Sequence, residues 1–279
     1  MLGEKKIGFI GSGNMGTALI RGLITSGTSS ADRIICSDIK EAKTSALHEE
    51  FAVKTTSDNC LVATEADIVI YAIKPQIMAR ILKETAPCLD MTKVVVSIAA
   101  GVPLAAINSC LKKDLRLIRV MPNVGSAVME SATGITAGDH ALNGDLDLVR
   151  GIFESIGKTV TVDEYLMDAI TGLSGSGPAY IFMIVDAMAD AGVKVGLSRE
   201  DSLYLSAQTL LGAAKLLIET QEHPSRLKDS VTSPGGTAIA GLHTLEEGGL
   251  RTTLINAVES ATKRAKELGE AMIKNFSNG

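Results

Sequence analysis

The stretch Ile7–Gly16, IGFIGSGNMG, decides the fold of the first half of the chain. Its glycines, Gly11, Gly13 and Gly16, stand between an apolar run typical of a buried strand and a segment with helical spacing of apolar residues. In such a context the first glycine permits a tight turn, the second lets a pyrophosphate approach the backbone, and the third lets helix and strand pack closely. The alternative is a structural turn with chance glycines, but the context favours dinucleotide binding.

Strands and helices alternate outward from this loop as far as Val162. The predicted strands lie in KKIGFIG, DRIICSD, AVKTT, DIVIYAIKP, KVVVSIAAG, LRLIRVMPN, TGITAG and GKTVTVD. Several of them are apolar with few charges, which is typical of a parallel sheet covered on both faces. We therefore predict an α/β fold in which residues 1–162 form a Rossmann-type, doubly wound dinucleotide-binding domain.

Residues 163–279 show helical patterns and no further strand, so we predict a second, all-helical domain. Its segment AYIFMIVDAMADA is apolar nearly all round, which indicates a buried helix. We expect this domain to bury its helices against a second subunit. The alternative is a self-contained helical bundle.

Composition limits the partners and the compartment. The net charge of −5 argues against nucleic acid as a partner, and no apolar run approaches a membrane span of about 20 residues. The 4 cysteines and 4 histidines form no ligand-spaced pair, which predicts no metal site. Because the first strand is predicted to begin by about Lys6, we expect no signal peptide. We expect a protein of a reducing compartment, the cytoplasm.

Several segments together resemble the pyrroline-5-carboxylate reductase family. They are IGFIGSGNMG, AIKPQ (Ala72–Gln76), SIAAGV (Ser97–Val102), RVMPN (Arg119–Asn123), GLSGSGPAY (Gly172–Tyr180), LLGAAKLL (Leu210–Leu217) and SPGGT (Ser233–Thr237). The resemblance implies reduction of the cyclic imine 1-pyrroline-5-carboxylate to L-proline with NADPH or NADH, the last step of proline synthesis. It also implies a helical domain that forms a homodimer, with decamers as a further assembly.

The resemblance also implies which residues bind the cofactor. At the pyrophosphate these are Ile10, Gly11, Ser12, Gly13, Asn14 and Met15. At the adenosine end they are Ser37, Asp38 and Asn59. On the nicotinamide side they are Ala72, Ile73, Lys74, Pro75, Ala99, Ala100 and Gly101.

Two of these residues have alternative interpretations. Asp38, about 22 residues beyond Gly16, is placed to bind a ribose 2′-hydroxyl and so to favour NADH, or simply to cap the next helix. The neighbouring Ser37 and Lys40 are suited to a 2′-phosphate, so the choice between NADPH and NADH stays open. Lys74 is interpreted as a cofactor contact or as a solvated lysine.

The stretch SPGGT interrupts a helical region and precedes the helix AIAGLHTLEEG. Free N–H groups there would bind the substrate carboxylate, so we expect substrate contacts from Ser233, Gly235, Gly236, Thr237 and Ala238. Thr237 is the candidate catalytic residue, with helix capping as its alternative role. Glu164 is a further substrate-binding candidate, and its alternative role is that of a first-turn acid of a helix. GLSGSGPAY is expected to be a second helix break, with Pro178 in the first turn of the following helix.

There are three departures from the family pattern. They are Val124-Gly125 after MPN, Ser230 before VTSPGG, and Ala238, where relatives commonly have threonine. Ala238, with its missing hydroxyl, and Val124-Gly125 motivate a second hypothesis, a cofactor-binding regulator without turnover. A third is a hydroxyacid dehydrogenase of similar architecture, for which Lys194 is the nearest candidate for the catalytic lysine.

Overall fold

The computed structural model of the chain describes residues 2–278. The chain divides into two compact units. The larger contains the residues up to Ser176 together with those from Glu259 onward, and the smaller is Gly177–Val258.

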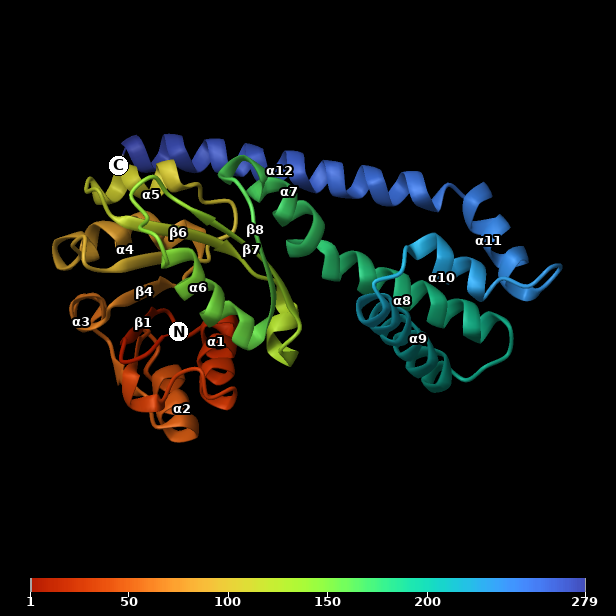
Figure 1. Ribbon diagram of the computed structural model, residues 1–279, viewed down its shortest axis with the longest axis horizontal. Coiled ribbons are helices and arrows are strands. Elements are labelled where there is room, and N and C mark those ends of the chain that lie inside the picture. Colours follow the sequence, from red (N-terminus) through yellow and green to blue (C-terminus); the bar gives the residue numbers. More distant parts are fainter. Residues whose placement is uncertain (1, 279) are drawn as a thin grey trace. The chain divides into compact units, whose positions relative to one another are not determined.

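The larger unit is built on an 8-stranded sheet in the order β3-β2-β1-β4-β5-β6-β7-β8 (Figure 1). Neighbouring strands are parallel except β6 and β7, which are antiparallel. The strands are β1 (Ile7–Ile10), β2 (Ile34–Ser37), β3 (Lys54–Thr56), β4 (Ile68–Tyr71), β5 (Val94–Ser97), β6 (Arg116–Met121), β7 (Ser131–Ala137) and β8 (Gly157–Thr161). Seven of them lie within a segment predicted to be a strand, and β7 begins two residues before the predicted segment TGITAG, so the α/β fold class is confirmed.

Helices connect these strands and cover both faces of the sheet. They are α1 (Asn14–Thr25), α2 (Glu41–Phe51), α3 (Asn59–Glu65), α4 (Pro75–Thr85), α5 (Leu104–Leu111) and α6 (Asp145–Phe153). A short helix, α7 (Met167–Ile170), follows the last strand. Helix α4 begins with Pro75 at a position where the missing N–H costs no hydrogen bond.

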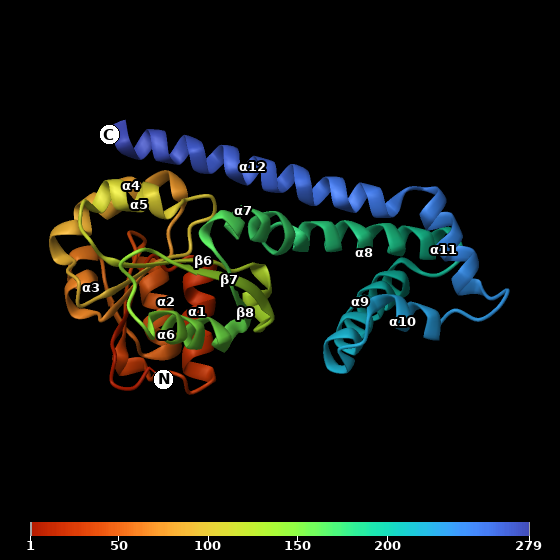
Figure 2. The same cartoon turned by 45° about the horizontal axis from the view of Figure 1, so that its top comes forward.

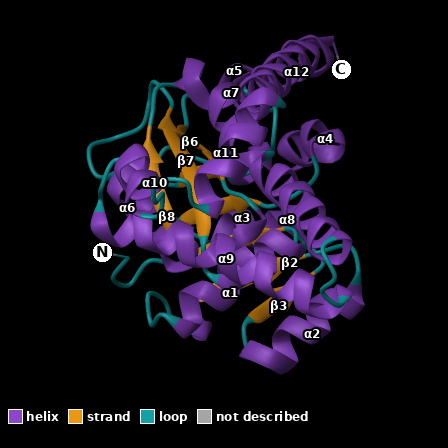
Figure 3. Ribbon diagram, turned by 90° about the vertical axis from the view of Figure 1, so that its right-hand side faces the viewer, coloured by secondary structure: helices purple, strands orange, loops and turns teal. Residues whose placement is uncertain are grey.

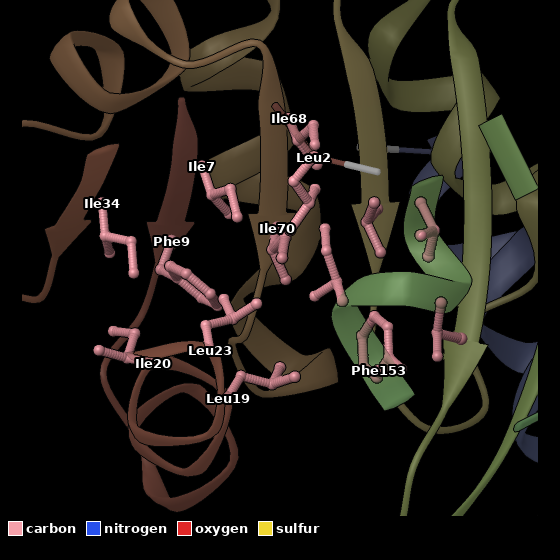
Figure 4. Close-up of a cluster of buried hydrophobic side chains, with 14 of the residues drawn as sticks. Leu2, Ile7, Phe9, Leu19, Ile20, Leu23, Ile34, Ile68, Ile70 and Phe153 are labelled. Atoms are coloured by element: carbon pink, nitrogen blue, oxygen red, sulfur yellow. The ribbon is translucent and has the colours of Figure 1, made fainter. Parts of the chain in front are cut away.

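The core lies in two layers because successive strand residues point to opposite faces of the sheet. Ile68 and Ile70 of β4 join the layer under α1, α2 and α6, part of which is drawn in Figure 4. Val69 and Tyr71 join the opposite layer, under α3, α4 and α5. Phe276 of the long helix α12 (Leu250–Asn278) is buried in this second layer, and Figures 1 and 2 both draw that end of α12 beside α5.

The strand order places β1 between β2 and β4, so the chain changes direction across the sheet at β1. Open α/β sheets bind ligands at the carboxyl ends of the strands on either side of such a point. The glycine loop follows β1 at this edge, and the loops after β4 and β5 end at the same edge because these strands are parallel to β1.

The smaller unit is entirely helical. It contains α8 (Gly177–Lys194), α9 (Arg199–Thr220), α10 (Pro224–Ser230), α11 (Thr237–Glu247) and the first turns of α12. Figure 3 colours these helices purple, and the orange strands in the same view all belong to the larger unit. None of the helices formed by residues 2–278 has the length and apolar character of a membrane span.

Helices α8 and α9 pack closely, but their apolar residues are poorly covered within one chain. A Cβ atom on Gly192 of α8 would lie 2.5 Å from the hydroxyl of Ser202 of α9. Yet Phe182 and Met183 of α8 are 66% and 67% exposed, and Leu211 of α9 is 60% exposed. Within residues 2–278 of a single chain, AYIFMIVDAMADA is therefore not buried. The helices of the smaller unit also do not form a bundle that covers its own apolar residues.

The predicted boundary at Val162 lies just after the last strand, where the chain becomes helical. The compact units divide later, after Ser176, and the residues from Glu259 onward return to the sheet. The division into residues 1–162 and 163–279 therefore marks where strands give way to helices. As a division into domains it stays a prediction.

Candidate active site

The three glycines of the loop after β1 have different surroundings. Gly11 has φ +103°, and a Cβ atom there would lie 2.6 Å from the Ala72 carbonyl oxygen. A Cβ atom on Gly16 would lie 2.5 Å from the Gly11 carbonyl oxygen. On Gly13 such an atom would meet no heavy atom of the described chain within 4 Å. Gly11 and Gly16 are thus required by packing, whereas Gly13 leaves open space in front of the backbone.

The N-terminus of α1 fits an anionic group at this open space. Gly13 is the N-cap residue and has no side chain to satisfy the first N–H groups. The N–H groups of Asn14 and Met15 have no backbone or side-chain partner within residues 2–278. A helix N-terminus with free N–H groups attracts phosphates, so this part of the chain fits a dinucleotide pyrophosphate.

Asp38 is held against the glycine loop. Its carboxylate accepts hydrogen bonds from the Ser12 N–H and hydroxyl, both at 2.9 Å, and from the Lys40 N–H at 2.9 Å. Burial acts to raise the pKa of Asp38, but these hydrogen bonds and the charge of Lys43 lower it below its ordinary value. The carboxylate is therefore ionised at neutral pH. The N-cap of α2 is Lys40, so the alternative role of Asp38 as the N-cap is wrong.

Beside Asp38 lies a cavity of about 290 Å³. It is lined by Ile10, Gly11, Ser37, Asp38, Ile39, Ser57, Asn59, Ile73, Ile77, Arg80, Ile81 and Glu84. The Ser37 hydroxyl donates to Asn59 Oδ1 at 2.7 Å, and Asn59 Nδ2 donates to Glu84 Oε1 at 3.0 Å. This chain of hydrogen bonds fixes the orientation of the Asn59 amide, so the cavity has a polar wall of defined geometry.

A second cavity, of about 530 Å³, lies on the other side of the loop. It brings together the predicted residues Gly13, Asn14, Met15, Ala72, Ile73, Lys74, Pro75, Ala99 and Ala100. Met121, Pro122, Asn123 and Val124 line it too, so the loop with the unusual Val124-Gly125 pair lies there. Two predicted cofactor residues, Ser12 and Gly101, line neither cavity. Ser12 is buried against Asp38, and Gly101 lies against Leu268 of α12.

The segment after α7 is wound as a π-helix over Thr171–Gly175. The α-helical pattern is therefore interrupted within GLSGSGPAY, by this π-helix and by the bend at Ser176, and Pro178 lies in the first turn of α8 as expected. Asn123 Nδ2 donates to the Ser174 carbonyl oxygen at 2.9 Å, and Gly175 lines the second cavity. Single π turns occur often at functional sites, and this one brings a helix against the predicted nicotinamide side.

Glu164 lies at the start of the 3₁₀ turn before α7. Its Oε1 accepts from Arg119 at 2.8 Å and from the Leu104 N–H at 3.1 Å. Arg119, on β6, is only 3% exposed. Its second terminal nitrogen, Nη2, lies 3.8 Å from Asp168 Oδ1. Oε2 of Glu164 has no hydrogen-bond partner among the residues that the structure describes. Glu164 therefore joins β6, the start of α5 and the turn before α7.

The stretch Ser233–Ala238 in the smaller unit forms a tight turn followed by α11. Gly235 has φ +67°, and the Gly236 N–H donates to the Ser233 carbonyl oxygen at 3.1 Å. Gly236 is the N-cap of α11 and Thr237 its first residue, so capping by the Thr237 side chain is wrong. The N–H groups of Thr237 and Ala238 have no partner within residues 2–278. They form a donor site for a small anion.

Several cavity residues have no counterpart among those predicted. Ile77, Arg80, Ile81 and Glu84 line the first cavity from one face of α4, and Lys43 of α2 lines the second. The α4 residues are spaced by three and four, which is the repeat of one helix face. That spacing, read from Pro75 onward, is the signal that was available in the sequence.

Comparisons with known proteins agree over both units. Residues 164–268 match the family model described as pyrroline-5-carboxylate reductase dimerisation. Residues 6–101 match the model described as NADP oxidoreductase, coenzyme F420-dependent.

Individual relatives match over most of their length. A pyrroline-5-carboxylate reductase of Methanosarcina acetivorans is 47% identical over 96% of this chain and 99% of its own. One from Arabidopsis thaliana is 44% identical over 95% and 96%. The solved structure of a pyrroline-5-carboxylate reductase from Coxiella burnetii is 38% identical, with a TM-score of 0.91 over 95% of this chain and 98% of that one. That of Plasmodium falciparum pyrroline carboxylate reductase with NADP bound has 31% identity and a TM-score of 0.84 over the same shares.

Proposed function

Because this chain belongs to the pyrroline-5-carboxylate reductase family, we propose that it reduces 1-pyrroline-5-carboxylate to L-proline with NADPH or NADH. This is the last step of proline synthesis. The observation that carries the proposal is a match at 47% identity over 96% of the chain, which spans both the glycine loop and the turn before α11. The supporting geometry is the pair of cavities around the glycine loop.

The larger unit supplies the residues that would hold the cofactor. The free N–H groups of Asn14 and Met15 suit the pyrophosphate, and the polar wall of Ser37 and Asn59 suits the adenosine ribose. Lys74 and Ala99 line the cavity on the nicotinamide side. When bound there, a reduced nicotinamide supplies a hydride. The remaining work of these residues is to orient the two reactants and exclude water.

The substrate itself limits how much side-chain chemistry is needed. The imine nitrogen takes up a proton, which makes the adjacent ring carbon electrophilic. Addition of a hydride to that carbon, with the proton retained on nitrogen, gives the ring amine of proline. This reaction therefore requires no side-chain nucleophile. Thr237 therefore stays a candidate for a hydrogen bond to the ring, and Ala238 contributes its backbone N–H.

We propose that Ser233, Gly235, Gly236, Thr237 and Ala238 bind the substrate carboxylate. The free N–H groups of Thr237 and Ala238 and the dipole of α11 support this, the dipole contributing about 0.3–1 kcal/mol. Glu164 stays a proposed substrate contact, with its unpartnered Oε2 in favour and its ion pair with Arg119 as a competing role.

Steady-state assays test the function directly. Oxidation of NADPH and NADH is followed with pyrroline-5-carboxylate and, in parallel, with small keto acids. We expect turnover with the imine alone. Turnover with keto acids only would indicate a hydroxyacid dehydrogenase, and cofactor binding without turnover of either would indicate a regulator.

The substitution Gly236→Val tests the carboxylate site. A Cβ atom there would lie 2.3 Å from the Ser233 hydroxyl, so the turn in front of the free N–H groups must change. We expect KM for the imine to rise about tenfold or more, the cost of one lost charge-assisted hydrogen bond. Nucleotide affinity, measured by fluorescence quenching, should not change.

The matched control for this test is Gly241→Ala in the same helix. A Cβ atom on Gly241 meets nothing within 4 Å in the described chain, so the imine KM should stay at the wild-type value. An unchanged KM in Gly236→Val would contradict the proposed carboxylate site.

We also propose a homodimer formed through the helical unit, with the decamer of the family as a further assembly. The exposed Phe182, Met183 and Leu211 support an interface on α8 and α9. A cytoplasmic location is supported by the cysteines, which are all free thiols in the structure.

A further inference from the structure

We propose that Arg80 of α4 binds the 2′-phosphate of NADPH and thereby sets the choice between NADPH and NADH. The inference rests on the proposed function, since it concerns the cofactor site of that reaction. It starts from one observation. The guanidinium of Arg80 lines the cavity beside Asp38 and has no hydrogen bond or ion pair with any residue between 2 and 278.

The other charged groups of this cavity are already engaged. Asp38 accepts three hydrogen bonds from Ser12 and Lys40. Glu84, one turn beyond Arg80 on the same helix, accepts from Asn59 at 3.0 Å and makes no ion pair with Arg80. Arg80 is therefore the cavity's cation, and its N–H donors are free for a ligand. A guanidinium binds phosphate oxygens in pairs, which gives it both strength and geometry.

The remaining lining of the cavity divides into two kinds of surface. Aliphatic side chains, Ile39 and Ile77 among them, offer contacts suited to the faces of an adenine ring. Ser37, Ser57 and Asn59 offer hydroxyl and amide groups. A phosphate monoester is the group that distinguishes NADPH from NADH. Because the Ser37 hydroxyl already donates to Asn59, the donors left for such a phosphate are the Ser57 hydroxyl, the second amide hydrogen of Asn59 and the Arg80 guanidinium.

Asp38 and Arg80 then have complementary roles. An ionised carboxylate at the end of β2 favours a ribose with a free 2′-hydroxyl and repels a 2′-phosphate. The unpaired Arg80, which lines the same cavity, offsets that repulsion. Together the two residues predict that the relative affinity of the site for NADPH and NADH depends on Arg80.

Binding of cofactor fragments tests this without any imine. Calorimetry with 2′,5′-ADP and with 5′-AMP compares nucleotides that differ by the 2′-phosphate alone. We expect Arg80→Met to lower affinity for 2′,5′-ADP relative to 5′-AMP by about tenfold or more, as loss of a charge-assisted hydrogen bond implies. Arg80→Lys should restore part of that ratio, because it keeps the charge but loses the paired donors.

Lys83→Met provides the matched control, since Lys83 is an exposed cation of α4 outside the lining of the cavity. An equal loss in this variant would mean that net charge is responsible and would overturn the proposal. Equal losses for 2′,5′-ADP and 5′-AMP in Arg80→Met would overturn it too, by placing Arg80 on the adenine. A protein that binds 2′,5′-ADP through Arg80 but does not reduce the imine would contradict the proposed reaction and leave the role of Arg80 supported.

Discussion

At the scale of single residues, the loop after β1 combines two glycines without free space and one that faces a cavity. The atoms closest to Gly11 and Gly16 belong to the backbone, which cannot move aside as a flexible side chain does. Side chains at these positions would deform the loop itself. A side chain at Gly13 would instead fill the space in front of the free N–H groups.

We expect Gly16→Ala to destabilise the protein by about 1–3 kcal/mol, the usual cost of forcing a methyl group into a packed site. Nucleotide affinity should fall with it, because the added Cβ would displace the Gly11 carbonyl group 2.5 Å away. Urea unfolding and nucleotide titration measure the two effects. Gly151→Ala, in α6, is the control. It has open space around its Cβ and should be neutral or stabilising by up to about 1 kcal/mol.

Residue spacing in the sequence predicted these glycines well, because the spacing of the three glycines and their place between a strand and a helix are local features, although Gly11 itself packs against the distant Ala72. It did not predict the partner of Asp38. The bond from Ser12 to Asp38 joins residues 26 apart and depends on how β2 lies beside β1. Arg80 was missed for a related reason, since its position depends on α4 packing beside α3.

At the scale of elements, the turn before α7 is tied to β6 and α5 by a single carboxylate. Glu164 contacts both Arg119 and the Leu104 N–H. The loop that precedes α5 carries Ala99 and Ala100 of the nicotinamide-side cavity. The position of this loop therefore depends on an ion pair outside the cavity.

We expect Glu164→Ala to destabilise the protein by about 1–3 kcal/mol, because it leaves the nearly buried Arg119 without its closest partner. Glu164→Gln should cost less, since the amide oxygen still accepts a hydrogen bond. Denaturant unfolding gives the free energies. Glu50→Gln, which removes an exposed pair with Arg21, should change stability by less than about 0.5 kcal/mol.

Imine kinetics on the same variants separate the two roles of Glu164. A raised KM in Glu164→Gln at wild-type stability would assign the residue to the substrate. Lost stability with an unchanged KM would assign it to the packing of the larger unit.

All the strands and most helices were predictable from apolar periodicity, since that pattern is local. The helices α4 and α5 were not proposed, although Pro75 and Pro103 mark their starts. The antiparallel pairing of β6 and β7 was also not predicted. Strand direction depends on the path of the connection between the strands, which a periodic pattern does not contain.

At the scale of the whole molecule, the smaller unit leaves apolar side chains of α8 and α9 uncovered. Several exposed apolar side chains on neighbouring helices indicate a protein–protein interface. We expect the wild-type protein to sediment as a dimer or larger assembly. Leu211→Glu, which places a charge on a 60% exposed apolar position, should shift the protein toward monomer.

Gln208→Glu on the same helix adds the same charge at an exposed polar position and should leave the assembly unchanged. A wild-type protein that sediments only as monomer would contradict the proposed interface. Sedimentation velocity at several concentrations distinguishes these outcomes.

The return of α12 to the sheet has a consequence for biosynthesis. Phe276 completes the apolar layer over α5, and Gly269 lies so close to Pro103 that an added Cβ would approach its ring to 3.1 Å. These residues leave the ribosome after the whole of Gly177–Val258. The nucleotide-binding unit is thus begun first and finished last, so its second face stays incomplete while the helical unit emerges.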